Sequence, residues 1–363
     1  MIDTEKFYEY LKSKELDYFV GVPDSLLKNL CACVGGIVAA NEGNAIGIAA
    51  GYHLATGKSA VVYMQNSGIG NAVNPLLSLA DSTVYSIPML LVVGWRGEPS
   101  TLDEPQHKKQ GAVTLELFKT FDIPAIILEE DYKSQIDYCV RYMKDNGKPI
   151  ALIVKKSSFS EYSFHKEECG YTLTREFSLT QIIDALDDRD FIVSTTGKTS
   201  REIFEIREKN NQSHSNDFLT VGSMGHASSI AFGLSLHTEK TVYCIDGDGA
   251  FLMHLGALAV IAQKCGANFK YILINNGAHE SVGGQPTVAF DIDIPKILSG
   301  MGFTNVYTAK TAAEIKDGVR RLKKEGAAAL VIYTKQGSRT DLGRPTITPA
   351  DNKICFMRKV GEL

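Results

Sequence analysis

Short apolar runs alternate with longer segments of mixed apolar and polar residues along the first half of the chain. The apolar runs predict strands at Tyr18–Val20, Gly36–Ala39, Ala60–Met64, Met89–Val93, Ala125–Leu128 and Ile150–Val154. An amphipathic helix is expected at the N-terminus, and the mixed segments predict helices at Ser25–Cys33, Glu42–Thr56 and Gly70–Ala80. Strands and helices that alternate in this way form a parallel sheet with helices on both faces.

The second half has a similar layout, although no internal sequence repeat can be aligned. Its expected elements are the helix Leu179–Leu186, the strand Phe191–Ser194, a loop at Thr195–Ser200, the strands Thr241–Ile245 and Phe269–Ile274, and the final strand Ala328–Tyr333. Residues 155–178 show no clear period and predict a linker between domains at residues 1–165 and 179–363. The tail from Lys335 onward is rich in Gly, Pro and Arg and is expected to be irregular. The predicted fold class is α/β, with two doubly wound parallel-sheet domains.

One stretch of the second half combines two predicted strands with residues that bind metals. Gly247-Asp248-Gly249 follows the strand Thr241–Ile245, a helical pattern covers Ala250–Lys264, and Asn275-Asn276 ends the next strand. A strand, a helix and a strand in this order place Asp248 and Asn276 at the carboxyl ends of adjacent parallel strands, where α/β sheets bind ligands.

The chemistry of this pair is specific. A carboxylate oxygen and an amide oxygen are hard ligands suited to Mg2+, which keeps positions for water and for ligand phosphates. The flanking glycines let the backbone approach a diphosphate, and the following helix directs its N-terminus at the anion. A glycine turn in a Rossmann-like sheet with an unrelated pair of asparagines would give the same residues. The spacing and the strand context favour the metal and diphosphate interpretation.

A helical segment of the first half has an unusual composition. Glu42 opens a helix of otherwise small and apolar residues, in which Gly43, Gly47 and Gly51 recur every four positions. Each glycine costs a helix roughly 0.5–1 kcal/mol relative to alanine, a cost that is tolerable if another helix packs tightly on the smooth ridge that the glycines form. Taken alone, Glu42 is explained by the preference of acidic residues for a helix N-terminus.

Composition and charge exclude several classes of function. The chain has 363 residues and a net charge of −4, without a basic block that would attract nucleic acid. No apolar run reaches membrane-spanning length, and the N-terminus lacks the apolar core of a signal peptide. Seven cysteines occur without a CxxC pair, which is typical of reduced thiols. We therefore expect a cytoplasmic protein that binds neither nucleic acid nor a membrane.

Other motifs for phosphates or zinc are incomplete. Gly197-Lys198-Thr199 resembles the end of a P-loop, but Ile192 stands where the first glycine is required. Gly68-Ile69-Gly70 lacks the third glycine of a dinucleotide motif. His279-Glu280 does not continue to a second histidine, and the eight histidines do not cluster at metal-ligand spacing.

Six segments together resemble the thiamine diphosphate-dependent 2-oxo acid decarboxylases over nearly the whole chain. They are GVPDSLLK (21–28), NEGNAIGIAAGYHLATGK (41–58), QNSGIGNAVNPLLSL (65–79), DEPQHKKQG (103–111), TTGKTSRE (195–202) and NNGAHESVGGQPT (275–287). They are most similar to the branch that decarboxylates phosphonopyruvate, with the sulfopyruvate decarboxylases as nearest relatives. The resemblance implies a pyrimidine-binding domain followed by a diphosphate-binding domain, without the third, central domain of pyruvate decarboxylase-like relatives.

The resemblance implies that thiamine diphosphate and Mg2+ bind this chain. It implies metal ligation by Asp248, Asn276 and the carbonyl of Ala278. Met224 would support the bent cofactor, and the carbonyl of Gly222 would accept its exocyclic amine; core filling is the alternative for Met224. The full set of cofactor contacts implied in the second half is Thr196, Gly197, Gly222, Ser223, Met224, Gly247, Asp248, Gly249, Ala250 and Asn276.

The resemblance also assigns proton transfer to four residues. Glu42 matches the carboxylate that binds the pyrimidine ring from an apolar site and shares a proton with it. Asp24 and His107 match proton-relay residues of the family only loosely, and His279 is a further relay candidate. Asp24 could instead stabilise its turn, and His107 could lie in a surface loop.

The implied reaction is decarboxylation of 3-phosphonopyruvate to phosphonoacetaldehyde and CO2, in phosphonate biosynthesis of the 2-aminoethylphosphonate type. The second anionic group of this small 2-oxo acid needs cationic or N–H donors. The candidates are Ser25, Arg96, Lys108, Lys109, Arg339 and Arg344, of which the basic residues are all expected in loops. A homodimer or higher homo-oligomer with active sites between subunits is expected.

Three alternatives remain at this point. The chain could decarboxylate sulfopyruvate or a related 2-oxo acid, or it could be a carboligase that joins the same intermediate to an acceptor aldehyde. It could also be a regulatory subunit that keeps the fold without the chemistry. The presence of Glu42 together with Asp248 and Asn276 in one chain argues against the last alternative.

Overall fold

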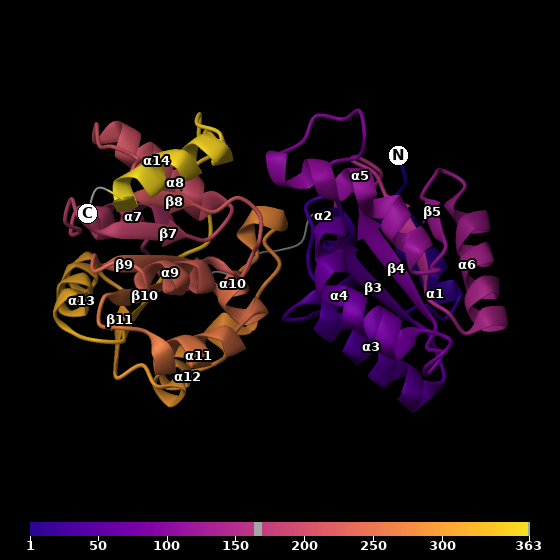
Figure 1. Cartoon of the computed structure of the whole chain (residues 1–363). Helices are drawn as coiled ribbons and strands as arrows, with labels where there is room; N and C mark the ends of the chain where they lie inside the picture. The colour runs from indigo at the N-terminus through magenta and orange to yellow at the C-terminus, as the bar shows by residue number, and fades with distance from the viewer. Residues whose placement is uncertain (163–168, 362–363) are drawn as a thin grey trace. The chain divides into compact units, whose positions relative to one another are not determined.

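The computed structural model describes residues 1–162 and 169–361 and divides into two compact units, Met1–Lys166 and Glu167–Leu363 (Figure 1). Within the described residues, each unit contains one six-stranded sheet whose strand pairs are all parallel. The predicted fold class, α/β with two doubly wound parallel sheets, is therefore confirmed. Part of the predicted linker at 155–178 lies outside the described residues.

Unit 1 alternates strands and helices in the manner that its sequence pattern predicts. Its strands are β1 (Phe19–Gly21), β2 (Ile37–Val38), β3 (Ala60–Gln65), β4 (Met89–Gly94), β5 (Ala125–Ile127) and β6 (Ile150–Val154). Its helices are α1 (Thr4–Ser13), α2 (Lys28–Val34), α3 (Glu42–Thr56), α4 (Ile69–Pro75), α5 (Pro105–Thr120) and α6 (Tyr132–Asn146), with a 3-10 turn η1 (Asn66–Gly68) and a π-helical turn η2 (Leu76–Ala80).

Unit 2 follows the same alternation. Its strands are β7 (Phe191–Ser194), β8 (Asp217–Leu219), β9 (Val242–Gly247), β10 (Phe269–Asn275), β11 (Asn305–Ala309) and β12 (Ala328–Tyr333). Its helices are α7 (Arg175–Ile183), α8 (Lys198–Lys209), α9 (Ala227–Ser235), α10 (Asp248–Met253), α11 (Gly256–Lys264), α12 (Ile294–Met301), α13 (Ala312–Lys324) and α14 (Pro349–Gly361), with 3-10 turns η3 (Glu280–Val282) and η4 (Val288–Phe290).

The two sheets share one topology. The strand order is β2-β1-β3-β4-β6-β5 in unit 1 and β11-β12-β10-β9-β7-β8 in unit 2. When the strands of each unit are numbered in chain order, and the second sheet is read from its other edge, both orders become 2-1-3-4-6-5. The order reverses between the first and third strands, and ligands of open α/β sheets bind at the carboxyl ends of the strands at such a switch point.

Each sheet is buried on both faces. In β3, for example, Val61 belongs to one apolar cluster and Val62 to the other, because successive side chains of a strand point to opposite faces. The sheet of unit 2 likewise separates two clusters, one around Ile272 and one around Leu273. These buried strands fix the positions of the loops at their carboxyl ends. No helix among the described residues is long and apolar enough to cross a membrane.

The structure corrects several predicted elements. The single helix expected at Ala250–Lys264 is divided into α10 and α11, because His254 leaves the helical conformation and its ring packs against that of His226. The predicted loop Thr195–Ser200 ends early, since α8 begins at Lys198. The helix predicted at Leu179–Leu186 lies at Arg175–Ile183 instead.

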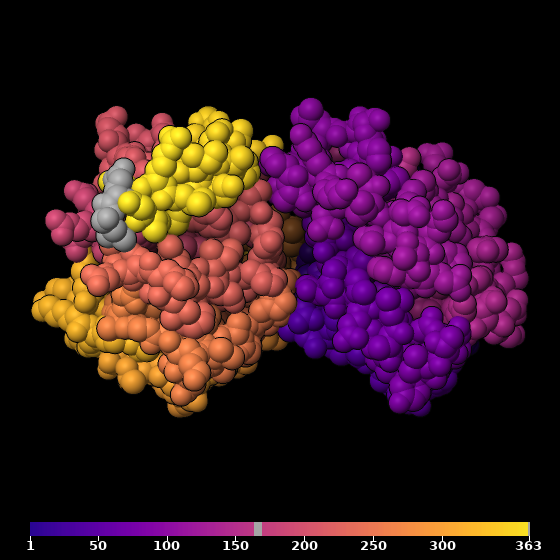
Figure 2. All heavy atoms as spheres, in the orientation of Figure 1, coloured from indigo at the N-terminus to yellow at the C-terminus, as the bar shows by residue number. Residues whose placement is uncertain are grey.

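The tail from Lys335 is not irregular throughout, because residues 349–361 form the helix α14 (yellow in Figure 2). Thr348 caps this helix by accepting the backbone N–H of Asp351, and Pro349 occupies the first helical position, which proline favours. Asn352 then bonds the backbone of β8 through both ends of its amide. The Gly, Pro and Arg content of the tail concealed this cap in the sequence.

Candidate active site

The predicted metal ligands of unit 2 lie together at the carboxyl edge of its sheet. Asp248 directly follows β9 and Asn276 directly follows β10, and these parallel neighbours pair Gly247 with Ile274. The switch point lies between β7 and β9, so the loop at Thr195–Gly197 borders Asp248 from the other side. The predicted placement at adjacent strand ends is correct.

Asp248 is a buried carboxylate without a basic partner. Asp248 is only 3% exposed, and one of its carboxylate oxygens accepts a hydrogen bond from the hydroxyl of Thr287 at 2.5 Å. Burial raises the pKa of Asp248 to about 6, although the Thr287 hydroxyl and nearby backbone N–H groups lower it in part. Among the described residues, no lysine or arginine forms a salt bridge with Asp248. A buried carboxylate in this condition fits a site that a cation completes.

The remaining predicted ligands follow in the same loop. Asn276 donates its side-chain N–H to Glu280 at 2.7 Å, and its amide oxygen accepts the backbone N–H of Ala278 at 3.2 Å. The carbonyl of Ala278 accepts the N–H of Glu280 at 2.9 Å and keeps a second lone pair. The donor set of carboxylate, amide and carbonyl oxygens therefore fits a hard divalent cation, with Asp248 as its one charged member.

Glu280 is also acidic and close to Asn276, but its charge is already balanced. Arg175 donates to one of its oxygens at 2.6 Å, and Lys198 donates to the other at 3.1 Å. Burial alone would raise the pKa of Glu280, yet Arg175 and Lys198 outweigh burial and hold that pKa below its usual range. Glu280 and Arg175 carried no usable sequence signal, because Glu280 was considered only as part of a zinc motif and Arg175 falls in the predicted linker.

Two further turns reach this edge. The Thr196 hydroxyl accepts the backbone N–H of Gly222 at 3.0 Å and thereby joins the loop after β7 to the loop after β8. Gly222 and Ser223 have φ angles of 75° and 47°, so two successive residues adopt the left-handed conformation that glycine tolerates best. Met224 follows this turn and is only partly buried, so core filling does not explain it. Gly197 leaves the Ser281 hydroxyl room that a Cβ atom would occupy.

His279 faces the Gly247-Asp248-Gly249 turn. A Cβ atom on Gly249 would lie 2.7 Å from Nδ1 of His279 and 3.1 Å from the methyl group of Met224. Gly249 is therefore required for the close approach of these two side chains. Burial lowers the pKa of His279 to about 4, which keeps the imidazole neutral near pH 7. Ala250, which is also a predicted cofactor contact, directly follows Gly249 and is buried in α10.

Glu42 lies at the first position of α3 in unit 1, where the side chain of Asn41 caps the helix. Glu42 is 5% exposed, and its carboxylate accepts a hydrogen bond from the side-chain N–H of Asn71 at 2.7 Å. Burial raises the pKa of Glu42, and no basic partner opposes this among the described residues. A Cβ atom on Gly68 would lie 2.2 Å from the Glu42 carboxylate. The close approach of Glu42 therefore explains why position 68 is a glycine, although the dinucleotide motif is incomplete.

The expected glycine ridge of α3 is only partly packed. A Cβ atom on Gly43 would lie 2.8 Å from the backbone oxygen of Asn71, so this glycine allows close approach of α4. Gly47 and Gly51 are exposed and have open space in front of them. Among the described residues, close packing by another helix therefore accounts for Gly43 but not for Gly47 or Gly51.

Asp24, Ser25, Arg96 and His107 come together at the switch point of unit 1. Asp24 is completely buried, and its carboxylate accepts the side chain of Gln65 at 2.5 Å and the backbone N–H of Leu26 at 3.1 Å. The bond to Leu26 stabilises the turn as well. Arg96 donates to the Ser25 hydroxyl at 2.8 Å. Burial raises the pKa of Asp24.

His107 is not in a surface loop, because it lies buried in the first turn of α5. Its Nδ1 atom has no hydrogen-bond partner among the described residues. Burial, followed by the charge of Arg96, lowers the pKa of His107 to about 4. Arg96 itself is held by both oxygens of Asp103, a partner that sequence reasoning missed.

The other four predicted substrate-binding residues are all exposed. Lys108 and Lys109 lie on the helix α5 rather than in a loop, because Pro105 starts the helix three residues earlier. Arg339 lies in a loop, as predicted, and forms salt bridges with Glu176, Glu205 and Asp341. Arg344 also lies in a loop, as predicted.

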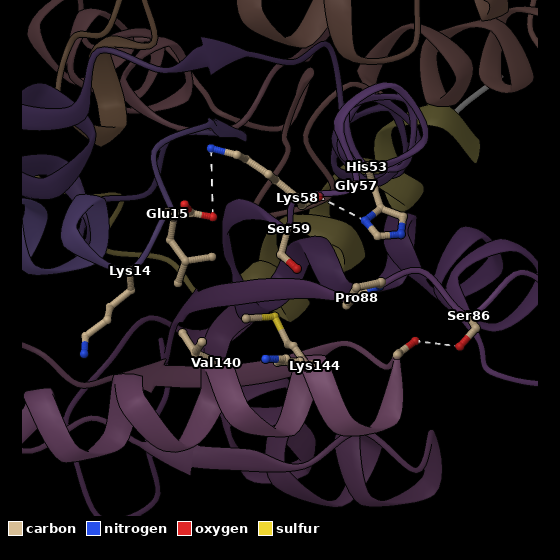
Figure 3. Close-up of a pocket in the computed structure, with 13 residues that line it drawn as sticks. Lys14, Glu15, His53, Gly57, Lys58, Ser59, Ser86, Pro88, Val140 and Lys144 are labelled. Atoms are coloured by element: carbon tan, nitrogen blue, oxygen red, sulfur yellow. Dashed lines mark hydrogen bonds and ion pairs between the residues drawn. The ribbon is translucent and has the colours of Figure 1, made fainter.

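A cavity of about 410 Å³ opens at the opposite edge of the unit 1 sheet (Figure 3). It lies near the amino ends of β3 and β4 and includes Lys58, Pro88 and His53 in its lining. Lys58 faces Glu15 across it at 4.0 Å, as Figure 3 shows. Ligands of parallel α/β sheets bind at the carboxyl edge, so this cavity is separate from the clusters described above.

Two family models match the chain. Residues 4–117 match the N-terminal TPP binding domain of thiamine pyrophosphate enzymes, and residues 195–333 match their C-terminal TPP binding domain. The fold, the Gly247-Asp248-Gly249 turn and these matches define a cofactor-dependent α/β enzyme that binds thiamine pyrophosphate, also called thiamine diphosphate. The chain belongs to the thiamine pyrophosphate enzyme family, and within it to the decarboxylases related to phosphonopyruvate and sulfopyruvate decarboxylases.

Relatives from three organisms support this placement. A phosphonopyruvate decarboxylase from Streptomyces hygroscopicus is 30% identical over 328 residues, which cover 85% of this chain and 80% of the relative. A sulfopyruvate decarboxylase from Methanosarcina acetivorans is 29% identical over 348 residues, covering 88% and 87%. In Methanocaldococcus jannaschii, a sulfopyruvate decarboxylase alpha subunit is 35% identical over 44% of this chain (96% of the subunit), and a beta subunit is 31% identical over 43% (81% of the subunit).

Proposed function

We propose that the chain decarboxylates 3-phosphonopyruvate to phosphonoacetaldehyde and CO2, with thiamine diphosphate and Mg2+, as a step of phosphonate biosynthesis. The observation that carries this proposal is the similarity over 85% of the chain to a phosphonopyruvate decarboxylase. The buried acidic groups of both units support it, because Glu42 and Asp248 are each retained in an environment that suits a cofactor contact.

In this proposal Asp248, Asn276 and the carbonyl of Ala278 hold Mg2+, which in turn binds the diphosphate. The turns at Thr196–Gly197 and Gly247–Ala250 offer backbone N–H groups to the phosphates, and the left-handed turn at Gly222–Ser223 presents a carbonyl to the exocyclic amine. When bound, thiamine diphosphate supplies an electron sink for the electrons released as CO2 leaves.

Glu42 is proposed to exchange a proton between its carboxylate and a ring nitrogen of the pyrimidine. The raised pKa of Glu42 supports this role, since a carboxyl group that titrates nearer neutral pH can both hold and release a proton. Asn71 fixes one carboxylate oxygen, and Gly68 leaves space beside the other. Met224 is proposed to support the bent form of the cofactor.

Three other groups are proposed to move protons at later stages. His279 is neutral near pH 7 and lies against the Gly249 turn, so it can accept or donate a proton there. Asp24 and His107 gather with Arg96 at the switch point of unit 1. Of the residues expected to bind the phosphonate, Arg96 and Ser25 are the best supported, because they already share a hydrogen bond within this cluster.

The test is a comparison of initial rates of CO2 release with 3-phosphonopyruvate, sulfopyruvate and pyruvate, each with thiamine diphosphate and with or without Mg2+. We expect the highest kcat/KM with 3-phosphonopyruvate and no turnover after chelation of Mg2+. A higher kcat/KM with sulfopyruvate would assign the chain to the other substrate, which the Methanosarcina relative favours. Equal rates with pyruvate would show that no second anionic group is recognised.

The carboligase alternative is tested by product analysis in the presence of an acceptor aldehyde. We expect free phosphonoacetaldehyde as the main product, and a joined hydroxyketone would overturn that expectation. A homo-oligomer with active sites between subunits is also proposed, on the family resemblance. The matches to separate alpha and beta subunits in Methanocaldococcus support only the presence of both kinds of domain in this chain. Light scattering of the purified protein measures its oligomeric state directly.

A further inference from the structure

Asn276 can serve as a metal ligand only if its amide is oriented correctly. The oxygen of an amide is a ligand for Mg2+, whereas its NH2 group repels a cation. The two ends have nearly the same shape, so packing alone does not distinguish them. A partner that can only accept or only donate hydrogen bonds is needed to fix the orientation.

Glu280 is such a partner. An ionised carboxylate only accepts hydrogen bonds, and Oε2 of Glu280 lies 2.7 Å from Nδ2 of Asn276. This contact directs the NH2 group of Asn276 toward Glu280 and leaves its oxygen on the opposite side. Both side chains are almost fully buried, so water does not compete effectively for the bond.

Glu280 is in turn held by two basic side chains. Nη1 of Arg175 donates to the same oxygen, Oε2, at 2.6 Å, and Nζ of Lys198 donates to Oε1 at 3.1 Å. Arg175 also donates to both oxygens of Glu202, at 2.7 and 2.8 Å. The two positive and two negative charges balance, and both oxygens of Glu280 accept hydrogen bonds from groups that can only donate.

We propose that Glu280, held by Arg175 and Lys198, is a positioning residue that orients the amide oxygen of Asn276 toward Mg2+. This inference rests on the proposed function, because it requires Asn276 to be a metal ligand. Outer partners of metal ligands orient them in many sites, and their removal weakens metal binding about 10–100-fold. Arg175 begins α7, so the proposal gives a role at the metal to a segment outside the strand-end loops.

A matched pair of variants isolates the hydrogen bond to Asn276. Glu280→Gln and Glu280→Met both remove the charge and have similar shapes, but only glutamine keeps an oxygen that can accept the N–H of Asn276. Glu202→Gln is the structural control, because Glu202 pairs with the same arginine at similar burial without contacting Asn276. Asp248→Ala tests the metal site itself.

The experiment is calorimetric titration of thiamine diphosphate into each full-length protein at a series of Mg2+ concentrations, together with its Tm without metal. We expect the half-saturating Mg2+ concentration to rise about 10–100-fold in Glu280→Met, about 3–10-fold in Glu280→Gln, and less than about 2-fold in Glu202→Gln, although Glu202→Gln also lowers Tm. Asp248→Ala should abolish the Mg2+ dependence within the measurable range.

The outcomes separate the two levels of the proposal. Equal Mg2+ affinity in Glu280→Met and Glu280→Gln, with Asp248→Ala impaired, overturns the positioning role and leaves the metal site standing. Unimpaired binding by Asp248→Ala overturns the metal site. If Glu280→Met does not fold, Glu280→Gln and Glu202→Gln decide, and identical Mg2+ affinity in these two variants overturns the proposal.

Discussion

The two units build different chemistry on the same strand order. In both, the loops after the first and third strands meet at the switch point. In unit 1, Asp24 follows the first strand and accepts a hydrogen bond from Gln65 at the end of the third strand. Arg96 completes this cluster by donating to Ser25. In unit 2 the corresponding loops carry Thr196 and the Gly247-Asp248-Gly249 turn, and Asn276 directly follows the fourth strand. The sheet determines where side chains converge, while the loop residues determine what they bind.

The key acidic residues also differ in their surroundings. Glu42 follows the second strand of unit 1 and starts a helix, with one amide partner and a glycine beside it. Asp248 follows the third strand of unit 2 and is surrounded by hydroxyl and backbone donors. Burial raises the pKa of both carboxyl groups. The surroundings of Glu42 suit proton exchange, whereas those of Asp248 suit a permanent cation, and this difference can be tested.

The largest expected effect is on turnover. Glu42→Gln keeps the shape and the bond to Asn71 but cannot exchange a proton, so kcat should fall by about 10²–10⁴-fold. Binding of thiamine diphosphate, measured by calorimetry at saturating Mg2+, should change by less than about 5-fold, because unit 2 is proposed to supply the diphosphate anchor. A kcat within about 10-fold of the parent would refute the role assigned to Glu42.

The reverse pattern is expected for unit 2. Asp248→Ala should weaken Mg2+-dependent binding of thiamine diphosphate by more than about 100-fold, because it removes the only charged metal ligand. Asp246→Asn is the control, since Asp246 is equally buried but bonds the hydroxyl of Tyr271. Cofactor affinity that survives Asp248→Ala, or falls as much in Asp246→Asn, contradicts the metal assignment.

The buried charge of Asp248 should also affect stability without metal. Because its pKa rises from 3.8 to about 6 on folding, the folded state binds more protons between these values, and stability falls as pH rises through them. Asp248→Asn removes this penalty and should stabilise the metal-free protein by about 3 kcal/mol at pH 8, with little difference at pH 4. Urea unfolding at the two pH values measures the change, and a gap independent of pH would contradict a buried ionised Asp248.

The smallest of these effects concerns the orientation of Asp248. Thr287 donates its hydroxyl to Oδ2 of Asp248, and we expect this bond to hold the carboxylate in the orientation that binds the metal. Thr287→Val should raise the half-saturating Mg2+ concentration about 10-fold, whereas Thr287→Ser should restore most of the affinity. Similar losses in both variants would point to packing rather than to the hydroxyl. The proton exchange proposed for Glu42 in unit 1 does not require the Thr287 hydroxyl, so kcat at saturating Mg2+ should change little in both variants.

The sequence was sufficient for the features that follow from local pattern. Apolar runs predicted all six strands of the first sheet and four of the six strands of the second, but not its two edge strands, β8 and β11. The pairing of β9 with β10 then brought Asp248 next to Asn276 as expected. Glu42 was predicted at the start of a helix of small and apolar residues, and it begins α3, where the structure adds the cap by Asn41. These features depend on neighbours in the chain or on adjacent strands, which periodicity reveals.

Features that depend on distant side chains could not be predicted in this way. Arg175 and Glu280 are separated by 105 positions and meet only after the sheet forms. Gly68 is required by the carboxylate of Glu42, which the glycine spacing alone did not indicate. Lys108 and Lys109, expected in a loop, lie instead on α5, which begins at Pro105. Arg339 pairs with Glu176 and Glu205, which precede it by 163 and 134 positions, so these partners could not be read from the sequence.

A crystal structure of the protein with thiamine diphosphate and Mg2+ tests the central claim most directly. We expect a metal ion at about 2.0–2.2 Å from oxygens of Asp248 and Asn276 and from the carbonyl of Ala278. We also expect the Glu42 carboxylate within hydrogen-bond distance of a pyrimidine nitrogen. Diphosphate density remote from Asp248 and Asn276, or a pyrimidine ring without contact to Glu42, would contradict the account.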